Sequence, residues 1–80
     1  MARKTKYKYE IKCYYMNDEL DENEIHKFET EDGAKFEAQY LARYYDKVLI
    51  FYIGGKNEPE VIAEYVNKNG RIHHIEKGGK

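Results

Sequence analysis

The sequence predicts a small α+β domain: a mostly antiparallel sheet of four to five strands with one helix on one face, in the order β-β-α-β-β-β. Three patterns predict it: a two-residue alternation near the start, an Ala- and Leu-containing stretch of helical period in the middle, and a short apolar run after it. Eighty residues suit one hydrophobic core. We therefore expect a single domain, 1–80, with flexible ends at 1–4 and 77–80.

The first strand is predicted from an alternation over residues 7–16. One face carries Tyr7, Tyr9, Ile11, Cys13 and Tyr15, and the other carries Lys8, Glu10, Lys12, Tyr14 and Met16. This pattern is typical of a strand with one buried face, where Cys13 would be an inert thiol. Residues 17–23 are acidic and poor in apolar groups, which predicts a hairpin loop. A shorter second strand is expected at 24–29, with Phe28 in the core.

A helix is predicted from Thr30 to about Tyr45. The Thr30 hydroxyl can cap the first turn, and two acidic residues follow it at the positive end of the helix dipole. The residues expected to face the sheet are Ala34, Ala38, Leu41 and Tyr45, with Tyr40 and Tyr44 beside them. An alternative places a hairpin turn at 32–33, because Asp-Gly is a strong turn signal. The helix-forming composition of the next dozen residues favours the helix.

Three further strands are expected in the second half of the chain. Residues 47–53 are apolar on both faces, which predicts a central strand. Residues 60–66 suit another strand, 67–70 a tight turn and 71–76 the last strand. A helix over 58–68 is the open alternative, because Asn57 and Glu60 fit a capping pattern and the apolar residues that follow fit a helical stripe.

Several classes of chemistry have no support in the sequence. Serine is absent and threonine occurs only at positions 5 and 30, so the sequence has neither a serine triad nor the phosphate-loop motif that ends in Lys followed by Ser or Thr. The acidic segment lacks the central glycine of a calcium loop, and His73 and His74 would point to opposite faces of a strand. We expect no enzymatic activity, no cofactor and no metal site. The single cysteine and the lack of a long apolar run predict a cytoplasmic protein outside the membrane.

Charge and aromatic content predict a protein-binding module. Residues 17–32 carry a net charge of −7, and the chain has nine tyrosines. One helix covers only one face of a sheet, so the other face is expected to present apolar groups to a partner. The partner would be a larger protein, for which this chain acts as a phage or mobile-element accessory or inhibitor protein, or a second copy in a homodimer. The expected docking residues are Tyr14, Met16, Asp18, Glu19, Asp21, Glu22, Leu49, Phe51 and Ile53.

Two other interpretations stay open. The charged segments can be solvated faces that attract each other within the molecule, and the tyrosines can be core aromatics. Alternatively, the basic first strand binds nucleic acid, because its cations are interleaved with Tyr7 and Tyr9. The residues expected to contact nucleic acid in that case are Arg3, Lys4, Lys6, Lys8 and Lys12.

Overall fold

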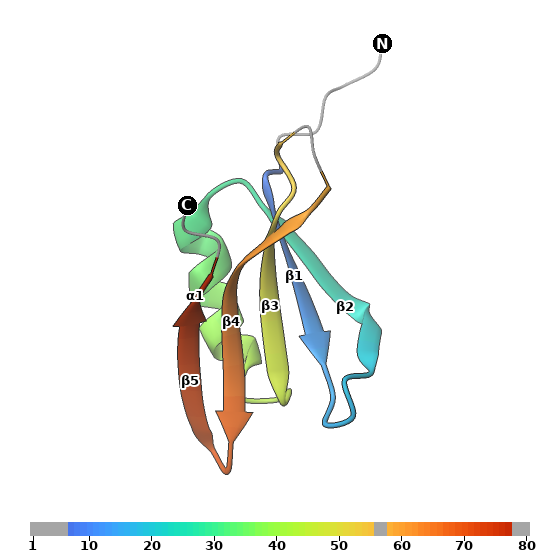
Figure 1. Ribbon diagram of the computed structural model, residues 1–80, viewed down its shortest axis with the longest axis vertical. Helices are drawn as coiled ribbons and strands as arrows, with labels where there is room; N and C mark the ends of the chain where they lie inside the picture. The colour runs from blue at the N-terminus through green and yellow to red at the C-terminus, as the bar shows by residue number, and fades with distance from the viewer. Residues whose placement is uncertain (1–6, 56–57, 78–80) are drawn as a thin grey trace.

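Five antiparallel strands and one helix form the part of the protein that the structure describes (Figure 1). The computed structural model describes residues 7–55 and 58–77. The elements are β1 (Tyr9–Tyr14), β2 (Leu20–Phe28), α1 (Glu31–Leu41), β3 (Lys47–Tyr52), β4 (Glu60–Lys68) and β5 (Arg71–Glu76). The strands lie in the order β2-β1-β3-β4-β5. The predicted fold class and element order are confirmed. Of the expected flexible ends 1–4 and 77–80, residues 1–4 and 78–80 lie outside the described residues, whereas the Lys77 N–H donates to the Ile62 carbonyl at 2.8 Å.

β1 is shorter than the alternation predicts. Ile11 and Cys13 are fully buried, but Tyr7 and Tyr15 at the two ends of the pattern are exposed. The strand ends because a turn follows, in which the Asp18 N–H donates to the Tyr15 carbonyl at 2.9 Å and Asp18 has a φ of 64°. β2 then begins at Leu20, so the expected loop 17–23 is wrong in its second half. An edge strand tolerates the acidic side chains there because one face remains in water.

α1 begins where the sequence predicts and ends earlier. The Thr30 hydroxyl accepts a hydrogen bond from the Gly33 N–H at 3.1 Å, as expected for an N-cap. Ala34, Ala38 and Leu41 are buried against the sheet. The helix stops at Leu41 and not at Tyr45, because residues 42–45 form tighter turns and the Ala42 carbonyl accepts a hydrogen bond from the Asn67 amide at 2.7 Å.

The core lies between α1 and the inner face of β1, β3 and β4. Val48 and Ile50 of the central strand β3 are fully buried. In β4, Ala63 is fully buried and Tyr65 is 1% exposed. Residues 60–68 pair with both β3 and β5, so they form a strand and not the alternative helix; Asn57 of the capping pattern lies outside the described residues. The turn to β5 has positive φ at Asn69 and Gly70.

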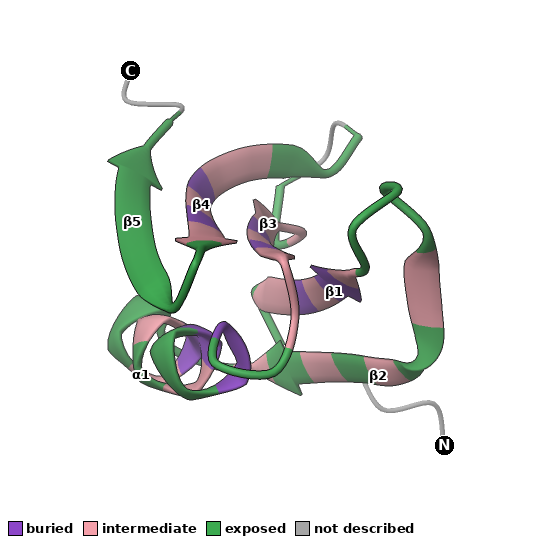
Figure 2. Ribbon diagram, turned by 90° about the horizontal axis from the view of Figure 1, so that it is seen from below, coloured by how far each residue is buried: buried purple, intermediate pink, exposed green. Residues whose placement is uncertain are grey.

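The outer face of the sheet, opposite α1, is partly covered by its own lysines. Leu49 and Phe51 are half-buried there. The Lys12 Nζ lies 5.1 Å from the centre of the Phe51 ring, and the Lys47 Nζ lies 5.3 Å from the centre of the Tyr14 ring. The aliphatic parts of such side chains shield apolar groups from water. Figure 2 shows the buried residues in α1, β1, β3 and β4, whereas β5 is exposed along its whole length.

Candidate protein-binding surface

The side of α1 turned away from the sheet and the turn that follows the helix carry three aromatic rings. Phe36, Tyr40 and Tyr44 follow one another at intervals of four residues and are 78%, 52% and 65% exposed. Residues at this spacing lie on one side of a helix. The rings of Tyr40 and Tyr44 pack edge to face, with centroids 5.5 Å apart. The opposite side of the helix is buried, whereas more than half of each of these three side chains is open to solvent.

A groove of about 670 Å³ separates this aromatic side of α1 from β5. It is lined by Phe36, Glu37, Gln39, Tyr40 and Arg43 from the helix and the turn after it, and by Tyr65, Ile72 and His74 from the strands. Lys35 ties the two elements together at one end, where its Nζ lies 2.8 Å from a Glu76 oxygen and 2.9 Å from a Glu31 oxygen. These contacts raise the pKa of Lys35 and lower that of Glu76.

Tyr65 is one of the groove-lining residues, and its hydroxyl is buried. The residue is 1% exposed, and its ring stacks on His74, with centroids 4.4 Å apart and planes 10° apart. Within the described residues the hydroxyl makes no hydrogen bond. Burial raises the pKa of Tyr65, and the neighbouring Gln39 amide acts in the opposite direction. A buried polar group of this kind is uncommon and destabilising unless a partner reaches it.

β5 is an edge strand. The backbone N–H and C=O groups on its open side belong partly to Ile72 and His74, which also line the groove. The Lys77 N–H donates to the Ile62 carbonyl of the preceding strand at 2.8 Å. Antiparallel pairs alternate between bonded and non-bonded, so the register directs the backbone groups of Ile72, His74 and Glu76 to the open edge. The side chains of the same three residues lie toward α1. Edge and groove therefore form one surface, the α1–β5 surface: Phe36, Glu37, Tyr40, Arg43, Tyr44, Ile72 and His74.

The docking residues predicted from the sequence are divided among several places. Met16 and Asp18 line a second hollow, of about 500 Å³, where an Asp18 oxygen accepts from Lys47 at 2.8 Å. Glu19 and Glu22 are exposed, and Asp21 turns toward the helix side of the sheet. The remaining members, Tyr14, Leu49, Phe51 and Ile53, are half-buried. The structure therefore does not gather the predicted set into one aromatic patch.

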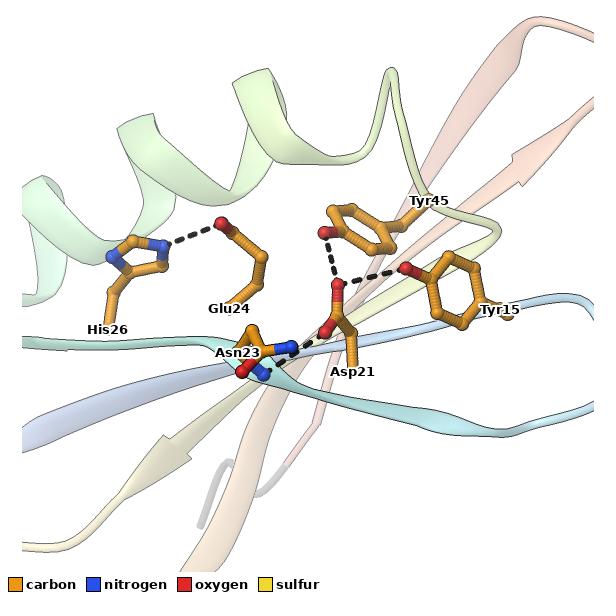
Figure 3. Close-up of polar contacts among 6 residues, drawn as sticks. All are labelled: Tyr15, Asp21, Asn23, Glu24, His26 and Tyr45. Carbon is orange, nitrogen blue, oxygen red and sulfur yellow. Dashed lines mark hydrogen bonds and ion pairs between the residues drawn. The ribbon is translucent and has the colours of Figure 1, made fainter.

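Asp21 is the centre of a polar cluster at the other sheet edge (Figure 3). One of its oxygens accepts hydrogen bonds from the hydroxyls of Tyr45, at 2.7 Å, and Tyr15, at 2.9 Å, and the other accepts from the Asn23 N–H at 3.0 Å. These bonds, with the one from Tyr45 foremost, lower the pKa of Asp21. The cluster connects β2 to the segment that follows α1. Its hydrogen bonds therefore serve to hold these two parts of the fold together.

A neighbouring His26–Glu24 pair has the side-chain types of an acid–base site. Its Nε2 and Oε1 atoms are 3.0 Å apart, and both side chains are more than one third exposed. Neither of the two hollows is lined by His26 or Glu24. Among the described residues no group of three or more His, Cys, Asp or Glu side chains is placed to hold a metal ion.

The basic residues proposed for nucleic acid are only partly described. Lys8 is exposed, and Lys12 lies over Phe51 on the outer face. Tyr9, which would have to stack on a base, packs against the core. Arg3, Lys4 and Lys6 lie outside the described residues. The described part of the strand therefore shows one exposed cation beside one exposed ring, Tyr7.

The exposed aromatic side of α1 is the feature that sequence reasoning missed. Tyr40 and Tyr44 were expected beside the buried stripe, and Phe36 was not assigned to the same side. Their regular spacing of four residues is the signal that identifies them. No protein-family model matches the sequence, and comparisons with curated proteins and with solved structures give no significant match. No helix in the described ranges is long and apolar enough to cross a membrane.

Proposed function

We propose that this protein is a non-catalytic protein-binding module and that its α1–β5 surface docks on another polypeptide. The observation that carries the proposal is the exposed row of Phe36, Tyr40 and Tyr44 beside a groove. Large aromatic side chains gathered outside a small domain are typical of interaction sites, because they give much contact area with few rotatable bonds. Tyrosine also tolerates the wet rim of an interface.

The backbone of β5 adds a second reason to expect a polypeptide as the ligand. An edge strand offers a row of N–H and C=O groups that another extended chain can pair with. Nucleic acid fits the surface less well, because Glu37 lines the groove and repels phosphate, and the Lys35 charge is already paired with Glu31 and Glu76. In this proposal the module acts as an accessory or inhibitor protein by covering part of the surface of its partner.

The acidic segment has a separate role in this proposal. Glu19 and Glu22 are exposed and lie within the strongly negative stretch 17–32. The segment lies at the β2 edge, opposite β5, and charge outside the contact changes the rate of encounter more than the final affinity. The segment therefore affects how fast a charged partner approaches, while the aromatic rings of the α1–β5 surface supply the binding energy.

The experiment that tests the function is site-specific photocrosslinking. A photoreactive phenylalanine analogue replaces Tyr40 in one variant and the exposed Met16 in a matched control, and both are irradiated in native lysate. A specific protein adduct at position 40, either a foreign chain or this chain itself, is the expected result. Substitution of Phe36→Ser in the position-40 variant must abolish it.

Two results would contradict the proposal. One is an adduct of equal yield at position 16, which would return the site to the region predicted from the sequence. The other is the absence of any protein adduct at position 40 together with a gel shift of oligonucleotides at ordinary salt, which would favour the nucleic-acid alternative.

A further inference from the structure

We infer that the partner of the α1–β5 surface is a second copy of this chain, related by a two-fold axis perpendicular to the sheet beside β5. The inference rests on the proposed function, because it names the occupant of the same surface. A single two-fold axis provides partners for three features of the molecule: the free edge of β5, the exposed aromatic row, and the charges of Glu37 and Arg43.

The first feature is the edge of β5. A two-fold axis perpendicular to a sheet places two edge strands side by side and antiparallel, and it keeps both inner faces on the same side. The outward N–H and C=O groups of Ile72, His74 and Glu76 then find partners in the other β5. The two sheets become one continuous sheet, and the open edge next to the groove disappears.

The second feature is the position of α1. The helix lies under the β5 side of the sheet, next to its free edge (Figure 2). The same axis therefore sets α1 antiparallel to the second α1. With the axis near Tyr40, Tyr40 meets its own equivalent. Phe36 then lies opposite the turn that follows α1 in the second copy, which carries Tyr44. Aromatic rings then cover aromatic rings on both sides of the axis.

The third feature is charge complementarity about the same centre. Glu37 precedes Tyr40 by as many residues as Arg43 follows it. Neither side chain forms an ion pair within the described residues, although both line the groove. Across the axis, Glu37 of each copy faces Arg43 of the other. Opposite charges and aromatic pairs arranged symmetrically about one residue are what an isologous contact requires, and a foreign partner has no need of that symmetry.

Charge reversal with mixing tests the dimer. At about 100 µM, sedimentation equilibrium of the wild-type protein is expected to give twice the 9.6 kDa chain mass. Glu37→Arg and Arg43→Glu each place like charges across the axis and are expected to weaken the dimer at least roughly tenfold. An equimolar mixture of the two variants restores opposite charges at both contacts, so a one-to-one heterodimer is expected. The double variant is expected to dimerise as the wild type does.

Amide hydrogen exchange gives a second readout that does not depend on the substitutions. The amides of Ile72 and His74 are expected to become protected as the protein concentration rises, whereas that of His73, already bonded to β4, is expected not to change. Circular dichroism of each variant confirms that it is folded.

A wild-type protein that stays monomeric at this concentration overturns the inference, and so does a dimer that neither charge reversal weakens. A monomer that still crosslinks a foreign protein through position 40 refutes the dimer and leaves the proposed function standing. A monomer with no protein adduct refutes both.

Discussion

The rings of Tyr65 and His74 lie face to face, 4.4 Å apart and 10° from parallel. The two residues are direct neighbours in the register of β4 and β5. The stack fixes Tyr65 as the floor of the groove and leaves its hydroxyl buried and without a hydrogen bond in the described structure. The core and the proposed interface therefore share one side chain.

Tyr65→Phe is expected to keep the fold and leave the free energy of unfolding unchanged or raise it by up to about 1 kcal/mol. The substitution removes a buried polar atom that has no hydrogen-bond partner and preserves the ring stack. Urea unfolding followed by circular dichroism measures the change. Tyr45→Phe is the matched control, because its hydroxyl donates to Asp21 at 2.7 Å and its removal should lower stability. A clear loss of stability in Tyr65→Phe would mean that its hydroxyl has a partner.

Asp21→Asn is expected to lower the melting temperature at neutral pH, with an effect that fades in acid. Hydrogen bonds from Tyr45, Asn23 and Tyr15 hold the pKa of the Asp21 carboxyl below its usual value. Its contribution to stability is therefore present above the unfolded-state pKa of about 4 and is lost as the pH falls through the lower folded-state pKa. Melting curves of both proteins from neutral to strongly acidic pH test this. A difference that stays constant over the whole range would contradict it.

Thr30→Ala is expected to destabilise the protein by about 1 kcal/mol. The substitution removes the oxygen that accepts a hydrogen bond from the Gly33 N–H at 3.1 Å, and so leaves a free amide in the first turn of α1. Chemical denaturation measures the loss. Thr30→Ser retains the hydroxyl and should come close to the wild type; equal losses in the two variants would show that the methyl group, and not the cap, matters.

The Cys13 thiol is expected to resist alkylation in the folded protein. It is fully buried, and burial, reinforced by the negative charge of Glu24, raises its pKa to about 12. Labelling with iodoacetamide near neutral pH should be slow and should accelerate in proportion to the unfolded population as urea is added. Rapid labelling without denaturant would show that β1 opens locally.

The sequence predicted the core better than the surface. Alternation placed Ile11 and Cys13 inside, and the helical spacing of Ala34, Ala38 and Leu41 placed them against the sheet; both predictions are confirmed. Burial of apolar residues follows from local periodicity, because each element has one inner side.

Element ends and the docking surface were predicted less well. Asp21 was assigned to a loop because of its charge, yet it lies in β2, where two tyrosine hydroxyls from other segments satisfy it. Tertiary partners of this kind leave no local pattern. The outer face of the sheet was expected to be apolar. The lysine side chains that lie over Phe51 and Tyr14 were not predicted, because the pairing of neighbouring strands determines those contacts.

The place of β1 between β2 and β3 has a consequence for how the chain is made. A nascent polypeptide can close the first hairpin early, but Ile11 and Cys13 meet Ile50 and Val48 only after β3 has left the ribosome. Until β3 is available, the apolar face of β1 lacks its main packing partner. Such folding intermediates are prone to incorrect strand pairing. Rapid synthesis of the middle of the chain shortens that vulnerable interval.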